Sequence, residues 1–340
     1  MYILGMESSC DETSAAVVEY KDGKFEIRSN IIASQIETHR LYGGVVPEIA
    51  SRAHIEAVSR ITTEALAQAN ITLSDIDCVA VTTHPGLIGA LLVGVNFAKS
   101  LAFANNIPLV SVNHIHGHIS AAYLEDGTLE PEFLSLVVSG GHTSIYICRD
   151  HLTLEEIGTT RDDAAGEAFD KIGRVIGMPY PGGAALDKLA YEGDAKAIKL
   201  PSPALHGSLD FSFSGIKTAA LNYINSANQK GEEINRADLA ASYTKAIVDA
   251  VVKQTAAAID QTGLKRLVLA GGVAANSHLR SALEKMCKEK KVIFTVPSRA
   301  LCGDNGAMIG AQAYYEYLAG NVADMSLNAY ATKSILGEAL

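Results

Sequence analysis

Apolar and polar positions repeat one layout in the two halves of the chain. Apolar runs at residues 2–5 and 15–19 flank a short polar stretch, which predicts a hairpin of two strands. Runs at 133–138 and 145–148 flank a stretch of small polar residues in the same way. A layout repeated within one chain is typical of an internal duplication, so we predict two similar halves.

Helical spacing and buried strands alternate after each hairpin, which predicts an α/β fold. In the first half, a helix that begins near Pro47 precedes a buried strand at 77–82. In the second half, Gly263 ends a long amphipathic helix, and Asn276 is placed to cap a helix at 277–290.

These patterns predict two lobes with a ligand cleft between them. We expect an N-terminal lobe at residues 1–130, a C-terminal lobe at 131–320 and a tail at 321–340. Residues 151–235 carry more charge, glycine and proline than the rest, with weaker strand patterns. We therefore predict a helical and loop insertion there, beside the site.

The composition indicates a folded globular protein with a large core. Hydrophobic residues make up 48% of the chain and charged residues 19%. The net charge of −10 argues against a generally basic nucleic-acid binder. It leaves nucleic acid possible as a substrate, because a local basic patch or a partner can supply positive charge.

The cysteines and the start of the chain indicate a cytoplasmic protein. No cysteine pair has CxxC or other metal-ligand spacing, which is typical of reduced core thiols. No apolar run approaches 18 consecutive residues, so we expect neither a signal peptide nor a membrane span. The five cysteines are Cys10, Cys78, Cys148, Cys287 and Cys302.

A histidine pair is the first candidate for metal chemistry. Asn113 follows an apolar strand and is a good helix N-cap, so His114 and His118 fall one turn apart on one helix face. Two imidazoles at that spacing can share a metal ion, although a structural or surface pair has the same spacing. His116 lies roughly 200° round the helix from His114 and should point elsewhere.

Two histidines do not make a tight metal site, so a third ligand must come from elsewhere. Asp304 lies at a junction between a strand, a loop and a helix and is our candidate for that ligand. Helix capping is the simpler interpretation of Asp304 taken alone.

The tips of the two predicted hairpins are candidates for phosphate and proton chemistry. Asp11 and Glu12 lie among serine and threonine residues at the first tip, where they form either a solvated turn or a group that binds metal or accepts a proton. Ser139, Gly140 and Gly141 at the second tip can form an anion-binding nest of backbone amides.

Ten motifs in order along almost the whole chain resemble one family, the TsaD tRNA N6-adenosine threonylcarbamoyltransferases, formerly called glycoproteases. That resemblance implies the actin/sugar kinase/heat-shock ATPase fold, duplicated, with a central cleft. The motifs are ESSCDETS, GGVVPEIASRAH, THPGLIGALLVG, NHIHGH, LVVSGGHT, DDAAGEAFDK, PYPGG, FSFSGIKTA, LAGGVAANS and CGDNGAMIG.

The resemblance also implies roles for individual residues. His114, His118 and Asp304 would bind one divalent metal, iron(II) in preference to zinc. The phosphate and ligand site would be lined by Val137, Val138, Ser139, Gly140 and Gly141. The nucleotide-bearing substrate would be held by Asp170, Gly183, Asp187 and Asn276.

The reaction implied by the resemblance is transfer of a threonylcarbamoyl group from threonylcarbamoyl-adenylate to N6 of adenosine 37, with release of AMP. The acceptors are tRNAs that read codons beginning with A. The implied partners are a paralogous TsaB-like protein, a small TsaE-like P-loop ATPase and a separate synthase. We suggest Asp11 or Glu12 as the base. Candidates for tRNA contact are Arg149, Lys171, Arg174, Lys217 and Arg299.

Two other functions fit parts of the sequence. A metalloprotease would use His-x-x-x-His, but zincins have Glu directly after the first His, where this chain has Ile115. A nucleotide-binding ATPase module of the same fold needs no histidine pair, so His114 and His118 argue against it.

Overall fold

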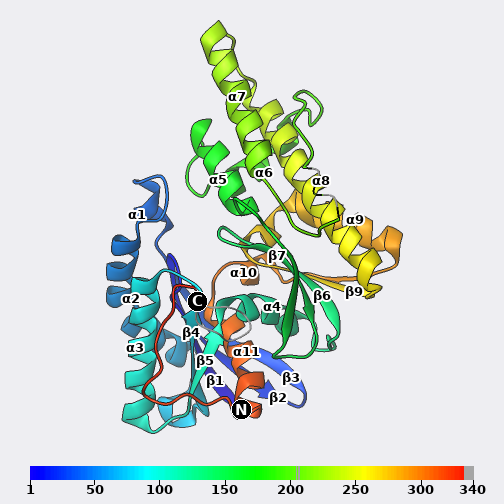
Figure 1. The fold of residues 1–340 in the computed structure, drawn as a ribbon. Helices are drawn as coiled ribbons and strands as arrows, with labels where there is room; N and C mark the ends of the chain where they lie inside the picture. The colour runs from blue at the N-terminus through cyan, green and yellow to red at the C-terminus, as the bar shows by residue number, and fades with distance from the viewer. Residues whose placement is uncertain (204, 206, 333–340) are drawn as a thin grey trace. The chain divides into compact units, whose positions relative to one another are not determined.

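The computed structural model describes residues 1–332 apart from 204 and 206. The chain forms two compact units, each with its own five-stranded sheet (Figure 1). The first unit comprises Met1–Pro131, Arg149–Leu154 and Pro297–Leu340. The second comprises Glu132–Cys148 and Glu155–Val296.

The sheet of the first unit has the strand order β3-β2-β1-β4-β5. The central strand β1 pairs antiparallel with β2 and parallel with β4, and β4 pairs parallel with β5. The predicted first hairpin is therefore confirmed, with longer strands and a shorter turn than its apolar runs suggested. The bounds are β1 Tyr2–Glu7, β2 Glu12–Lys21, β3 Lys24–Ser34, β4 Cys78–His84 and β5 Leu109–Asn113.

Alternation along β1 separates two cores in the first unit. Leu4 and Met6 pack with residues of helices α2 and α3, whereas Ile3 packs with residues of α4 and α11 on the opposite face. Helices of different lengths complete this unit. The helices are α1 Ile36–Arg40, α2 Pro47–Ala69, α3 Ile88–Asn105, α4 His114–Glu125, α10 Arg299–Cys302 and α11 Gly306–Leu318.

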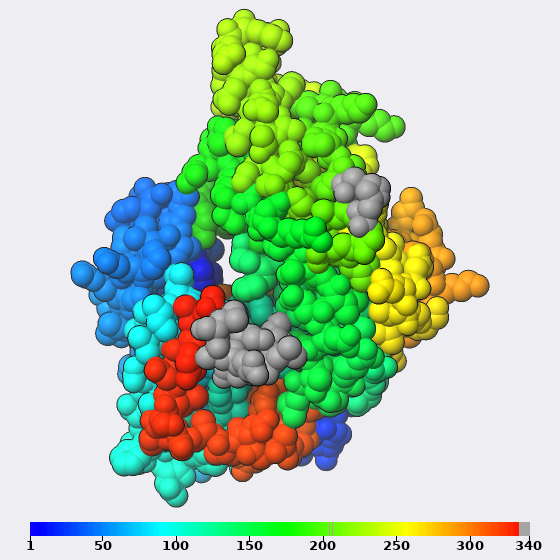
Figure 2. All heavy atoms as spheres, viewed as in Figure 1, coloured from blue at the N-terminus to red at the C-terminus, as the bar shows by residue number. Residues whose placement is uncertain are grey.

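The C-terminal segment lies on the surface of the first unit, in red beside α3 in cyan (Figure 2). The backbone N–H of Ala323 donates to Leu109 O (2.8 Å), and the amine of Lys99 donates to Leu327 O (2.8 Å). Residues up to 332 of the predicted tail thus pack along strand β5 and helix α3. Positions 333–340 of that tail lie outside the described residues.

The second unit repeats the sheet of the first. Its order is β10-β9-β6-β7-β8, with β6 antiparallel to β7 and parallel to β9. The central strand β6 thus has one antiparallel and one parallel neighbour, as β1 has, which agrees with the predicted duplication. The bounds are β6 Phe133–Val138, β7 Thr143–Cys148, β8 Leu154–Thr159, β9 Arg266–Ala270 and β10 Ile293–Thr295.

Helices are the main regular structure in the region that we predicted as an insertion. Between β8 and α8 the chain forms three α-helices, and the later helix at 277–290 begins and ends where the sequence predicted. The bounds are α5 Ala165–Val175, α6 Gly182–Leu189, α7 Ser214–Lys230, α8 Arg236–Thr262 and α9 Ser277–Lys290.

The unit boundaries differ from the lobes that we predicted. Residues 297–320 belong to the first unit because α11 packs closely on β1 and β2. A Cβ on Gly306 would lie 2.6 Å from Gly5 O, so the two backbones meet without side chains between them. This contact joins positions about 300 residues apart, which no local pattern reveals.

Helix α3 is the one segment of the described chain that is long and apolar enough to cross a membrane by length and composition. Core helices of soluble proteins pass the same test. The side chains of Leu91, Val95 and Ala98 are buried in the core of the first unit, as in such a helix. We had expected no candidate span, because the helix contains no unbroken apolar run of that length.

Candidate metal centre and substrate site

The histidine pair lies at the start of α4, directly after β5. The Asn113 side chain accepts hydrogen bonds from the N–H of Ile115 (2.7 Å) and of His116 (3.3 Å), so the predicted N-cap is confirmed. The His114 and His118 rings lie on one face with their centroids 4.5 Å apart. Because α4 starts directly after β5, both imidazoles lie buried and close together at the end of this strand.

Asp304 joins this pair from the loop between α10 and α11. Its Oδ1 lies 3.2 Å from His118 Nε2 and 3.6 Å from His114 Nε2. The cap of α11 is Asn305, whose side chain accepts from Met308 N, so the capping interpretation of Asp304 is wrong. The ligand atoms of the three residues all lie within 4.8 Å of one another.

These residues fit a divalent metal. Ligands bound at about 2.1 Å in tetrahedral geometry are about 3.4 Å apart, close to the observed separations from Asp304. Both ring nitrogens of His118 are buried and lack a hydrogen-bond partner among the described residues. A buried unpaired polar atom is costly, and a cation between Nε2 and the carboxylate would remove that cost.

Glu7 supports the site from behind His114, a role that the sequence did not reveal. Its Oε2 lies 3.0 Å from His114 Nδ1 and accepts from Thr82 Oγ1 (2.6 Å), and its Oε1 accepts from Ser9 N (2.5 Å). A carboxylate at Nδ1 favours the tautomer with its proton there, which leaves Nε2 free to bind metal.

Burial and neighbouring charges shift the pKa values of the groups around His114 and Asp304. Burial opposes the charge of His114, but the carboxylates of Asp304 and Glu7 raise its pKa to about 9. Burial would raise the pKa of Glu7, but His114 lowers it overall. Burial, Asp304 and Asp11 together raise the pKa of Glu12 to about 9. The carboxyl groups of the β1–β2 turn thus act electrostatically on the metal cluster.

The Ser139–Gly141 turn joins β6 to β7 in the second unit. Ser139 N donates to His142 O (2.7 Å), and Ser139 Oγ accepts from His142 N (3.1 Å). A Cβ on Gly140 or Gly141 would meet nothing within 4 Å, so a ligand can approach this backbone closely. The side chains of Val137 and Val138 are buried in the strand before it.

The other four residues implied for substrate binding lie on or beside helices α5, α6 and α9. Asp170 Oδ1 accepts from Gly183 N (3.0 Å) and so holds the first turn of α6. Asn276 caps α9 by accepting from Leu279 N (2.8 Å). Asp187 Oδ1, in the second half of α6, accepts from Ser277 N (3.0 Å), which ties α6 to the start of α9.

Two of the basic residues suggested for tRNA contact are already paired. Lys171 Nζ lies 3.0 Å from Asp163 Oδ1, and Lys217 forms an ion pair with the same carboxylate. Asp162 accepts from the hydroxyls of Ser212 and Ser214. The DDAAGEAFDK and FSFSGIKTA motifs therefore form one structural unit, whereas Arg174 and Arg299 are exposed.

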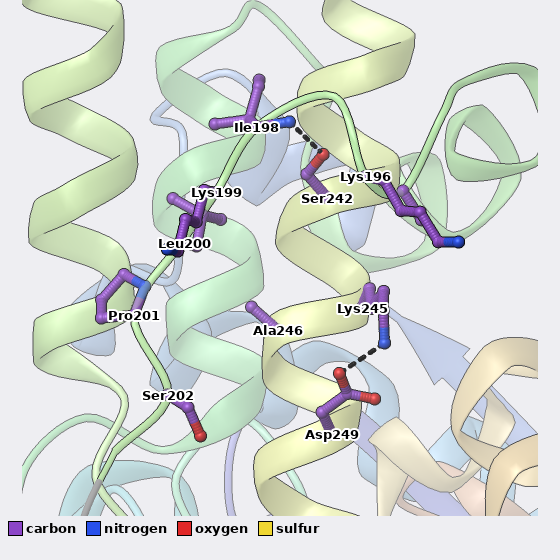
Figure 3. A pocket seen from close by; sticks show the side chains of 11 residues that line it. Lys196, Ile198, Lys199, Leu200, Pro201, Ser202, Ser242, Lys245, Ala246 and Asp249 are labelled. Atoms are coloured by element: carbon purple, nitrogen blue, oxygen red, sulfur yellow. Dashed lines mark hydrogen bonds and ion pairs between the residues drawn. The ribbon is translucent and has the colours of Figure 1, made fainter.

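A separate hollow of about 340 Å³ lies between residues 195–202 and α8 (Figure 3). Lys245 on its wall pairs with Asp249 (2.5 Å), and the Ser242 hydroxyl accepts from Ile198 N (3.1 Å). None of the site residues predicted from the sequence lines it.

Solved structures show the class of fold. HypF from T. kodakarensis aligns with a TM-score of 0.62 at 16% identity, over 94% of this chain and 48% of that chain. ROK hexokinase from Thermus thermophilus aligns with a TM-score of 0.50 at 16% identity, over 93% and 100%. The chain thus has the actin/sugar kinase/heat-shock ATPase fold, as predicted.

Sequence relatives show the family. The TsaD family model, described as tRNA N6-adenosine threonylcarbamoyltransferase, matches residues 26–311. The protein of that name from Clostridium botulinum (strain 657 / Type Ba4) is 56% identical over 328 residues, 96% of each chain. The chain belongs to the TsaD family and is an acyltransferase that modifies tRNA.

Proposed function

We propose that the chain transfers the threonylcarbamoyl group of threonylcarbamoyl-adenylate to N6 of adenosine 37, in tRNAs that read codons beginning with A, and releases AMP. Family membership supports the reaction, and the convergence of His114, His118 and Asp304 supports metal assistance.

His114, His118 and Asp304 would hold one divalent cation, iron(II) in preference to zinc. Two imidazoles and a carboxylate suit either ion and leave positions open for substrate. When bound, such a cation supplies Lewis-acid polarisation of the donor's carbonyl or phosphate oxygens. Glu7 would keep His114 in the ligating tautomer.

The acceptor amine is a weak nucleophile because its lone pair is delocalised into the adenine ring. As its nitrogen attacks the carbamoyl carbon and the bond to AMP breaks, the amine loses a proton. Asp11 or Glu12 would accept that proton. Glu12 must first lose the proton that its raised pKa retains, and a cation beside Asp304 would favour that loss.

Residues of the second unit would bind the donor. Backbone amides of Gly140 and Gly141, in the turn that follows Val137, Val138 and Ser139, would stabilise negative charge on the departing phosphate. Asp170, Gly183, Asp187 and Asn276 would hold the nucleotide part. The exposed guanidinium groups of Arg174 and Arg299 are the better candidates for tRNA contact, because Lys171 and Lys217 are paired.

We further propose that the enzyme works in the cytoplasm with a TsaB-like paralogue and a small TsaE-like P-loop ATPase, supplied with adenylate by a separate synthase. The net charge of −10 is consistent with an enzyme that relies on partners to attract tRNA.

A reconstituted assay tests the proposal. The chain, both partners, the synthase, unmodified tRNA, threonine, bicarbonate and ATP are combined, and nucleosides are read by mass spectrometry. We expect threonylcarbamoyl-adenosine from the wild type and at least about a 100-fold loss in His114→Ala, because one of three metal ligands is gone. His116→Ala is the matched control, since it removes a buried imidazole of α4 that lies outside the ligand group.

Absence of product from the complete mixture, with ATP hydrolysed by this chain alone, would support an ATPase module instead. Equal activity of His114→Ala and wild type would contradict the metal role.

A further inference from the structure

The turn between β1 and β2, residues 8–11, is held by hydrogen bonds to two distant segments, the start of α3 and Gln35. The Ser8 hydroxyl donates to Ala90 O (3.0 Å), and Leu87 N donates to Ser9 O (2.8 Å). Gln35 N donates to Asp11 O (3.0 Å). The bonds at Ser8, Ser9 and Asp11 therefore position this turn against other elements of the first unit.

His54, in the middle of α2, makes two further contacts at this turn. It is fully buried, with Nε2 2.9 Å from Cys10 O and Nδ1 2.7 Å from Thr13 Oγ1. A carbonyl oxygen can only accept, so Nε2 carries the proton. In the neutral ring Nδ1 then accepts from the threonine hydroxyl.

We propose that His54 is a positioning residue for the transfer reaction, holding the turn so that the carboxyl groups of Asp11 and Glu12 remain beside the metal ligands. This inference rests on the proposed role of those two carboxyl groups. Burial lowers the pKa of His54, which is consistent with a neutral imidazole that donates at one nitrogen and accepts at the other.

The two hydrogen bonds of the His54 imidazole span the part of the chain that carries the two acids. Its two nitrogens bond on either side of Asp11 and Glu12, to residue 10 and to residue 13. Loss of both bonds would loosen the chain at Cys10 and Asp11, where it enters β2, while the backbone of Glu12 and Thr13 remains paired with β3. A displacement of about 1 Å at a reacting group can cost on the order of 100-fold in rate.

The test compares His54→Leu, His54→Gln and Thr13→Val in the reconstituted assay with all partners. We expect His54→Leu to lower kcat about 10- to 100-fold with KM for tRNA and metal content unchanged. The amide nitrogen of glutamine reaches about as far as Nε2, so His54→Gln should recover much of that loss. Thr62→Val is the control for Thr13→Val, because its buried hydroxyl bonds only within α2, to Val58 O.

Hydrogen exchange of peptides spanning residues 8–14 gives a readout that is independent of activity. We expect faster exchange in His54→Leu, or in Thr13→Val if the leucine variant does not fold, but not in Thr62→Val. Unchanged exchange, an unchanged kcat, or equal losses in the leucine and glutamine variants would each overturn the proposal. If the wild type makes no product, the proposed function fails, and the exchange result still decides the role of His54.

Discussion

Glu7 and His114 illustrate how one side chain sets the tautomer of another in a candidate metal site. The carboxylate of Glu7 lies 3.0 Å from Nδ1 of His114, on the side away from Asp304, which faces Nε2 at 3.6 Å. A ring with its proton on Nδ1 presents its lone pair to the metal position. The carboxylate of Glu7 therefore selects the tautomer of His114 that can bind a metal through Nε2.

Replacement of Glu7 tests whether its carboxylate selects this tautomer of His114. We expect Glu7→Gln to weaken zinc or cobalt binding about 10- to 100-fold, because a neutral amide makes the imidazole less basic and can present its NH₂ group to Nδ1. Competition with a chelator at fixed pH measures the affinity. The control is Glu48→Gln, which removes an equal charge from an exposed position on α2. Equal affinities in Glu7→Gln and wild type would contradict the role of Glu7.

Among the secondary-structure elements, local signals predicted some closely and others not at all. Asn113 and Asn276 cap α4 and α9 where expected, because a cap bonds to amides two or three residues away. Strand β8 was missed because four of its six residues are not hydrophobic, and because its partners, β7 and residues 210 and 211, are other segments of the chain. Long-range pairing of this kind leaves little trace in a short window of sequence.

Helix α7 is an element whose start depends on a residue far away in sequence. Asp162 accepts hydrogen bonds from the N–H of Phe213 (2.8 Å) and of Ser214 (3.2 Å). We expect Asp162→Ala to lower the unfolding free energy by about 1–2 kcal/mol, as for a lost helix cap. Thermal unfolding should show a decrease of several degrees. Asp249→Ala, which removes an exposed ion pair within α8, should cost less, and an equal cost would contradict the capping role.

Across the whole molecule, duplication and topology explain how much of the site could be predicted. The repeated hairpins and the histidine spacing are local patterns, so the α/β class and two of the three candidate metal ligands could be inferred directly. Asp304 and Glu7 reach His114 only because α11 and β1 pack in the same unit, at opposite ends of the chain. The supporting contacts of Asp162 and Asp163 likewise join segments about 50 residues apart.

The pairing of Asp163 with two lysines should make stability depend on pH. Burial opposes its charge, but the amines of Lys217 and Lys171 lower the pKa of Asp163 below its ordinary value. A carboxyl with a lower pKa in the folded state adds stability above its unfolded pKa of about 3.9, and that stability is lost as pH falls through the folded pKa.

We therefore expect Asp163→Asn to unfold at a lower temperature than wild type at pH 7, with a difference that shrinks as the pH approaches 3. Calorimetry at both pH values, repeated with Asp249→Asn as the exposed control, measures the effect. A difference of constant size across this range would show that the ion pairs of Asp163 do not supply the stability, and that the asparagine destabilises the protein through packing alone.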